Sequence, residues 1–189
     1  MLVSGTADLL LPAAAGPFLC CPMIHPAAGD EEQAMRTMRR IRKKTTYDKA
    51  REILSRAEWG VLSTTCDDGL PYGVPLSFVL TGNAVYFHCA TEGQKLDNLM
   101  HDRRVCLTAV NAPKVLPETL SMAYESVMAF GEARIVYGEA ERQAALRLLC
   151  EKYAPDRPAE GVDAYLKAHG KNTVVVRMDV EYISGKASR

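Results

Sequence analysis

Hydrophobic and polar side chains alternate with the two-residue spacing of a β-strand in six segments of the chain, and helical spacing occurs in others. Short turns such as Asp67-Asp68-Gly69 separate several of the six segments. The predicted strands are 59–65, 72–80, 85–90, 104–110, 122–137 and 173–183. Helices are predicted from Thr45 or Thr46 to about 58, near 92–100 and over 139–153, with a short one near 162–168; 111–120 is predicted as a loop.

The order of these elements indicates the fold class. Strands follow one another without alternating helices, which favours an antiparallel barrel over a parallel α/β sheet. The prediction is a mainly β (α+β) protein, an antiparallel Greek-key split barrel with peripheral helices. Pro75 lacks an N–H for the ladder, so its strand is expected to have an edge or an irregularity there, and a bend is expected at Gly131. The 189 residues suit one domain that buries roughly 70% of its extended surface.

Charge excludes some partners. Lys plus Arg and Asp plus Glu both number 23, so nothing in the net charge argues for nucleic acid or an acidic membrane surface. No apolar run reaches the roughly 18 residues of a membrane helix. The basic cluster at 38–44, MRRIRKK, is either a nucleic-acid patch or a solvated arm, and the lack of interleaved aromatic residues favours the arm.

The first 34 residues differ from the rest, being rich in Ala, Pro and Gly without a sustained period. A secretory signal is the functional alternative, but no Lys or Arg precedes the apolar residues 9–11. We expect a disordered tail, or a true start at Met35 or Met38. The domain prediction is therefore an N-terminal extension over 1–37 and a folded domain over 38–189.

The six cysteines do not form a disulfide or zinc pattern, since no Cys-x-x-Cys pair or His/Cys cluster is present. Cys66, Cys89, Cys106 and Cys150 are expected to be reduced thiols of a cytoplasmic protein.

The stretch 85–98, VYFHCATEGQKLDN, carries the clearest functional signal. A strand runs into a Gly-containing turn and a helix start, which presents free N–H groups and a positive dipole end. With Lys95 in the first turn, the site suits a phosphate, although a solvated helix start has the same pattern. Val85 and Phe87 alternate with Tyr86 and His88, so both strand faces are expected to be covered.

Three blocks in this order, DGLPYGVPLSFV, YFHCATEGQKLDNL and YESVMAFGEARIV, resemble the flavin-binding split-barrel proteins related to pyridoxamine 5'-phosphate oxidase. The chain is most similar to their branch of nitroimidazole-resistance proteins, over about 38–186. The resemblance implies FMN as cofactor, and a homodimer because the family's flavin site lies between two subunits.

The resemblance also implies roles for individual residues. Lys95 and the N–H groups around Gly93 and Gln94 would hold the FMN phosphate. Ser63, Thr64, Pro75, Leu76 and Ser77 would wall the isoalloxazine ring, Cys89 and Ala90 would lie beside the cofactor, and Ser126 would contact it from the long strand. His88 would lie beside the flavin as the candidate catalytic residue; a core histidine is the alternative.

The functional prediction is an FMN-dependent oxidoreductase that reduces a small nitroaromatic- or quinone-like acceptor. A flavin carrier or sensor without turnover, and a split barrel that uses haem or a deazaflavin, remain alternatives. The chain lacks the C-terminal Trp, Arg and His block that holds pyridoxal phosphate in the oxidases, which argues against pyridoxamine phosphate oxidation. No Gly-x-Gly-x-x-Gly motif indicates the electron donor.

Overall fold

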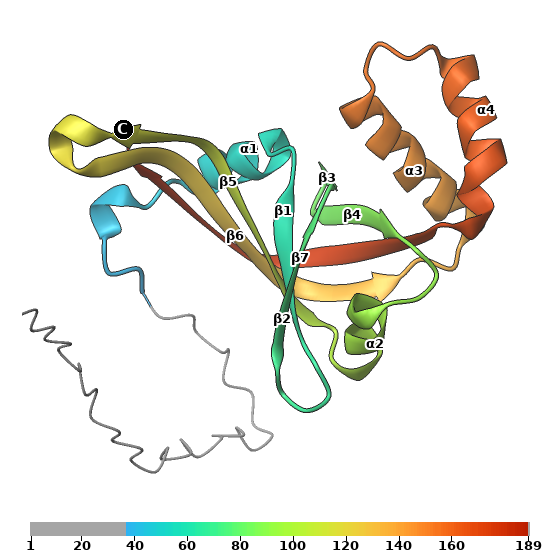
Figure 1. The fold of residues 1–189 in the computed structure, drawn as a ribbon, viewed down its shortest axis with the longest axis horizontal. Helices are drawn as coiled ribbons and strands as arrows, with labels where there is room; N and C mark the ends of the chain where they lie inside the picture. Colours follow the sequence, from blue (N-terminus) through green and yellow to red (C-terminus); the bar gives the residue numbers. More distant parts are fainter. Residues whose placement is uncertain (1–36, 189) are drawn as a thin grey trace, which may run out of the picture. The chain divides into compact units, whose positions relative to one another are not determined.

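The computed structural model describes residues 37–188, so the predicted N-terminal extension lies almost entirely outside the described residues. These residues form seven strands and four α-helices (Figure 1). The strands are β1 Gly60–Thr65, β2 Pro71–Leu76, β3 Val79–Thr81, β4 Ala84–Cys89, β5 Arg104–Leu116, β6 Ser121–Ile135 and β7 Val174–Ser188. The helices are α1 Tyr47–Arg56, α2 Gln94–His101, α3 Glu139–Tyr153 and α4 Ala159–His169, with 3₁₀ turns at Ile41–Lys43, Pro117–Thr119 and Gly170–Asn172.

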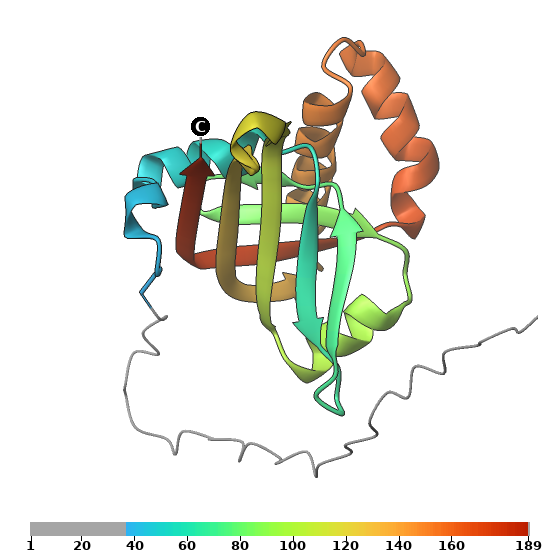
Figure 2. The same ribbon diagram turned by 60° about the vertical axis from the view of Figure 1, so that its left-hand side comes forward.

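All strands join one sheet in the order β2-β1-β5-β6-β7-β4-β3, and each neighbouring pair is antiparallel. The two edge strands, β2 and β3, are joined in sequence by only Ser77 and Phe78, yet they do not pair with each other. The sheet must therefore curl until its edges meet at this junction, and it stays open there (Figures 1 and 2). The predicted antiparallel split barrel is confirmed.

The main hydrophobic core fills the inside of the curled sheet, where Leu62, Phe87, Leu107 and Met178 have no exposed surface. Helix α1 adds its apolar stripe, which the spacing predicted: Ala50, Ile53, Leu54. The side chain of Thr46 caps α1 by accepting a hydrogen bond from the Lys49 N–H.

A second core lies outside the barrel, between β4 and the α3–α4 hairpin. Tyr86 and Val175 on the strands pack with Leu146, Leu149 and Leu166 on the helices. Strand β4 is therefore buried on both faces from Ala84 to Phe87, as its sequence predicted.

The predicted loop at 111–120 is wrong. Strand β5 continues to Leu116 and pairs with β6 to this last residue, with a register shift between Asn111 and Lys114. The irregularity holds Ala112, at a φ of 45°, and Pro113, so the missing N–H of the proline falls where the ladder is interrupted. The predicted strand 72–80 is also wrong as one element, because it is two strands separated at Ser77 and Phe78.

Gly131 lies at a second irregularity, where the pairing of β6 with β7 shifts register between Phe130 and Gly131. A Cβ atom at this position would lie 1.8 Å from the main-chain oxygen of Asp179, which rules out any side chain without backbone movement. The close approach of the Asp179 main chain therefore explains why glycine occupies this irregular position.

We expect Gly131→Ala to destabilise the protein by about 3 kcal/mol or more, because the clash is with main chain that cannot move aside. Gly161→Ala in α4 is the control. Its nearest neighbour is the Arg157 side chain at 3.4 Å, and alanine favours a helix by up to about 1 kcal/mol. Urea unfolding of both variants measures the difference, and equal midpoints would contradict the steric account.

Candidate functional site

The predicted phosphate site lies where β4 runs into α2. Gly93 precedes the helix with a φ of 132°, a backbone region that favours glycine, and it provides no side-chain cap. Its carbonyl accepts from the Leu96 N–H at 2.8 Å. The first N–H groups of a helix have no partner within it, so those of Gln94 and Lys95 are available to an anion.

A chain of hydrogen bonds between side chains fixes α2 against the end of β1. The Asn98 amide donates to the Thr64 hydroxyl at 2.8 Å, and the Gln94 amide donates to the Asn98 oxygen at 2.7 Å. The Gln94 amide also approaches the Cys66 sulfur at 3.7 Å. Asn98 and Thr64 are only 2% and 4% exposed, so this network sets the place of the helix from inside the protein.

The network revises the roles of two predicted contacts. Thr64 points into the barrel, where it is 4% exposed and its hydroxyl accepts from Asn98, so its side chain lies away from the outer surface of the sheet. The side-chain nitrogen of Gln94 donates to the same network, and the main-chain N–H of Gln94 stays available at the helix start. Sequence reasoning missed Asn98; the available signal was its polar side chain between Leu96 and Leu99, which are three residues apart on one face of the helix.

His88 is exposed near the end of β4, so the core-histidine alternative is wrong. Its neighbour Cys89 faces the core and is half-buried. Burial raises the pKa of the Cys89 thiol, and the charge of Lys95 opposes that shift. Ala90 is exposed in the turn that follows, so these residues surround the start of α2.

Ser63 and Pro75 lie on the outer side of the sheet, opposite the core. Two rows of outward-facing residues cross five strands there: Pro75, Val61, Thr108, Met128, Ser184 and Gly73, Ser63, Cys106, Phe130, Tyr182. We call these rows the open face, since none of the described helices covers it (Figure 2). Met128 is 43% exposed and Tyr182 41%, and the rings of Phe130 and Tyr182 lie 6.0 Å apart.

Leu76 and Ser77 lie beside the barrel opening. The Leu76 side chain is half-buried and packs against the main core, whereas Ser77 is exposed just after β2 ends. Through Pro75 these residues are continuous with the open face.

Ser126 lies apart from the other candidates. It faces outward on β6 and pairs with Val110 of β5. Ser63 lies two strands away on β1, level with Phe130 of β6, which is four residues along the strand from Ser126. At about 3.3 Å per residue, that is roughly 13 Å along the strands, and in the direction away from α2. Within one chain, Ser63 and Thr64 therefore lie near α2 and Ser126 lies four residues further along, whereas Pro75 and Leu76, paired with Val61 and Gly60, lie between these two levels.

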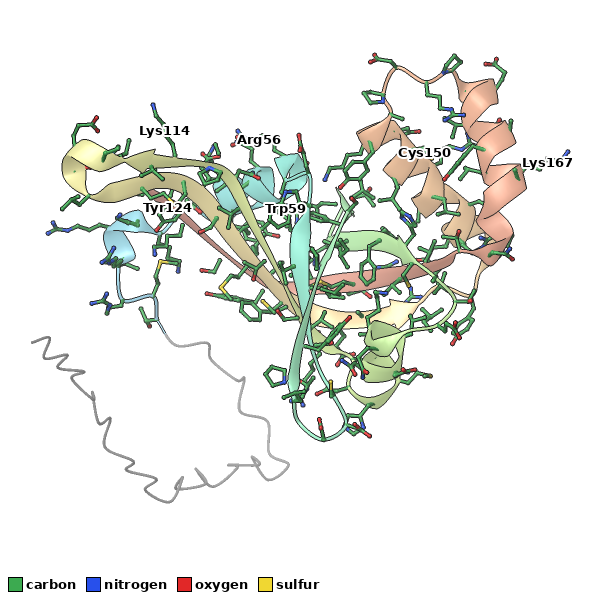
Figure 3. All side chains as sticks on the ribbon, viewed as in Figure 1. Arg56, Trp59, Lys114, Tyr124, Cys150 and Lys167 are labelled. Carbon is green, nitrogen blue, oxygen red and sulfur yellow. The ribbon has the colours of Figure 1, made fainter. Side chains whose placement is uncertain are left out.

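A pocket of about 430 Å³ opens next to the outward-facing Val110, beside the junction of α1 and β1. Trp59, 55% exposed, and Arg56 line it together with the β5 irregularity at Asn111–Pro113 (Figure 3). Sequence reasoning missed this pocket because the residues that shape it were predicted as a loop.

Within residues 37–188, no three His, Cys, Asp or Glu side chains group as a metal site. None of the helices in that range is both long and apolar enough to cross a membrane.

Comparison with known proteins gives one family. The model of the family described as pyridoxamine 5'-phosphate oxidase matches residues 46–187. A search of curated proteins found no match.

Solved structures share the fold. A protein of Bacteroides thetaiotaomicron assigned to 5-nitroimidazole antibiotic resistance is 24% identical, with a TM-score of 0.64 over 86% of this chain and 95% of that one. A flavocytochrome of Azotobacter vinelandii is 20% identical, with a TM-score of 0.65 over 82% and 73%. An FAD-binding protein of Mesorhizobium loti is 19% identical, with a TM-score of 0.59 over 78% and 98%. At these identities the likeness concerns the fold alone.

We expect Asn98→Leu to cost about 1–3 kcal/mol of stability, because it leaves the Thr64 hydroxyl and the Gln94 amide without their partner. Adding Thr64→Val should recover part of that loss, since the second change removes one of the stranded groups. Urea unfolding of the two single variants and the double variant measures the coupling. Strictly additive losses would mean that the hydrogen bond between Asn98 and Thr64 contributes nothing.

Proposed function

We propose that this chain, which belongs to the pyridoxamine 5'-phosphate oxidase family, binds FMN and uses it to reduce a small nitroaromatic- or quinone-like acceptor. The observation that carries the proposal is the start of α2, where Lys95 and free N–H groups are held against the end of β1. This donor set fits a phosphate, which needs several N–H groups and a cation. Bound FMN would supply the electron chemistry, and the chain would supply position and charge.

The outer sheet surface suits the rest of such a cofactor. A ring system placed over β1 and β2 would meet Ser63 and Pro75 and the exposed Ser77, while His88 lies exposed at the end of β4. The solved neighbours include an FAD-binding protein and a flavocytochrome, so their names share a flavin as cofactor class. We favour FMN because the three sequence blocks resemble FMN-binding proteins. The nitroimidazole-resistance neighbour supports a nitroaromatic acceptor.

The visible spectrum of the purified protein tests the proposal. We expect flavin absorption bands, FMN after extraction, and bleaching of the bands by a reduced nicotinamide nucleotide. His88→Ala should keep most FMN affinity, because one imidazole hydrogen bond is worth about 0.5–1.5 kcal/mol, but should lose rate with a nitroaromatic acceptor. Flavin bands without any turnover would favour a carrier; bands of haem, or extraction of FAD, would overturn the FMN assignment.

Lys95→Ala should act on the phosphate and not on the ring. FMN carries close to two more negative charges than riboflavin, and charge-assisted hydrogen bonds are worth about 1.5–3 kcal/mol each. We expect the protein to prefer FMN to riboflavin by about a hundredfold or more, and the variant to lose about tenfold of that preference. Fluorescence titration of the apoprotein measures both affinities. Equal losses for the two ligands would assign Lys95 a role in folding instead.

We also propose a homodimer with the flavin site at the subunit interface. The open face exposes Met128 and Tyr182 without any described helix over it, and a second copy would cover these apolar side chains. Ser126 supports the same arrangement, since within one chain it lies far along the strands from Ser63. A two-fold related copy would bring the Ser126 of one chain toward the α2 end of the other.

Light scattering should give about twice the 20.8 kDa mass of one chain. Met128→Glu should shift the protein toward monomer and weaken FMN binding, because it buries a charge in the interface. Tyr137→Glu is the matched control: Tyr137 is 87% exposed, follows the end of β6 and lies outside the open face. A wild-type monomer with flavin bound would contradict the dimer.

A further inference from the structure

Phe78 is in an unusual position in the barrel. Together with Ser77 it joins the two edge strands, and it belongs to neither. Its side chain is fully buried in the main core, so its main-chain N–H and C=O lie close to the interior without strand partners. Main-chain groups that leave a sheet still need hydrogen bonds when they are shielded from water. The partners come from another part of the chain.

The last two residues of α3 provide those partners. The Phe78 N–H donates to the Tyr153 hydroxyl at 2.9 Å, and the Lys152 ammonium donates to the Phe78 carbonyl at 2.8 Å. The Tyr153 hydroxyl has a single proton, which lies between the carbonyls of Glu58 at 2.6 Å and Phe78 at 2.8 Å. The Lys152 ammonium also lies 4.4 Å from the centre of the Phe78 ring.

The same two side chains bind the start of β1. The Lys152 ammonium donates to the Ala57 carbonyl at 2.6 Å, and Ala57 and Glu58 form the connection from α1 to β1. The end of α3 is thus bonded to the β1 entry and to the barrel opening at once. Burial lowers the pKa of Lys152, and the two carbonyls offset part of the cost of its charge.

This contact is next to the proposed cofactor site. Burial raises the pKa of the Tyr153 hydroxyl, and the Phe78 main chain and the neighbouring Ser77 side chain oppose that shift. Ser77 is one of the residues expected to meet the flavin ring, and Pro75 and Leu76 precede it. The end of α3 is therefore bonded to the main chain directly after the residues expected to face the flavin ring.

We propose that Lys152 and Tyr153 are positioning residues of the cofactor site: by holding the main chain of Phe78 and of Ala57–Glu58, they fix the opening between β2 and β3 and the backbone that faces the flavin ring. The inference rests on the proposed function for its ligand. It adds two residues of α3 to the site residues on β1, β2, β4, α2 and β6 that the sequence resemblance implies.

Tyr153→Phe and Lys152→Met test this, since each keeps the bulk of the side chain and removes its polar end. We expect FMN and riboflavin affinities to fall by the same factor, about tenfold, because the ring site moves while the phosphate site does not. The controls are Tyr137→Phe and Lys167→Met, which alter exposed side chains away from the opening and should bind both flavins as the wild type does.

A second measurement needs no flavin. The Phe78 amide is bonded to the Tyr153 hydroxyl, so its hydrogen exchange in the apoprotein should accelerate at least tenfold in Tyr153→Phe and stay unchanged in the controls. Unchanged exchange would overturn the inference, even if the other variant failed to fold. Unchanged affinity for both flavins in folded variants would mean that Lys152 and Tyr153 stabilise the fold without positioning the cofactor site.

The remaining outcomes are also decisive. A loss confined to FMN would mean that α3 acts on the phosphate site, which contradicts the proposal. A wild-type protein that binds neither flavin would overturn the proposed function and this inference with it. A wild type that binds both, with variants that bind equally well, would overturn the inference alone.

Discussion

The two-residue connection between β2 and β3 is the constraint on which the structure depends. Since these strands lie at opposite ends of the sheet order, two residues can join them only if the sheet curls until its edges meet. The curl creates an inside, where the core packs, and an outside, where the open face is left. It also leaves the main-chain N–H and C=O of the junction without strand partners, so other elements must provide their hydrogen bonds. Core, open face and opening are therefore consequences of one short connection.

Much of the fold could be predicted from the sequence because local pattern determines it. The helix at 139–153 lies where its spacing placed it, and the double-sided burial of β4 follows from its apolar residues on both faces. The extension of β5 beyond Val110 was not predicted, because a proline such as Pro113 normally interrupts a strand. Only the pairing with β6 shows that the ladder resumes at Lys114. The break at Ser77–Phe78 was not predicted for a related reason. It is caused by the closure of the sheet, which a short stretch of sequence does not reveal.

The candidate site was predictable where one continuous stretch forms it. The segment from His88 to Lys95 is a strand, a turn and a helix start, and its chemistry can be recognised in order. Asn98, Thr64 and the end of α3 were not recognised in their roles, because their partners lie 34 to 95 residues away along the chain. A polar residue inside an apolar pattern was the one local sign, and it did not identify the partner.

The contacts of Lys152 and Tyr153 with Ala57, Glu58 and Phe78 have a consequence for sequence evolution. Most of the atoms they bind are carbonyl oxygens and an N–H of the main chain, which every residue except proline provides. Substitutions at 57 and 58 would keep the acceptors in place, so no compensating change at 152 or 153 would be selected. Covariation between alignment columns would not detect this connection, although it joins three separate parts of the chain.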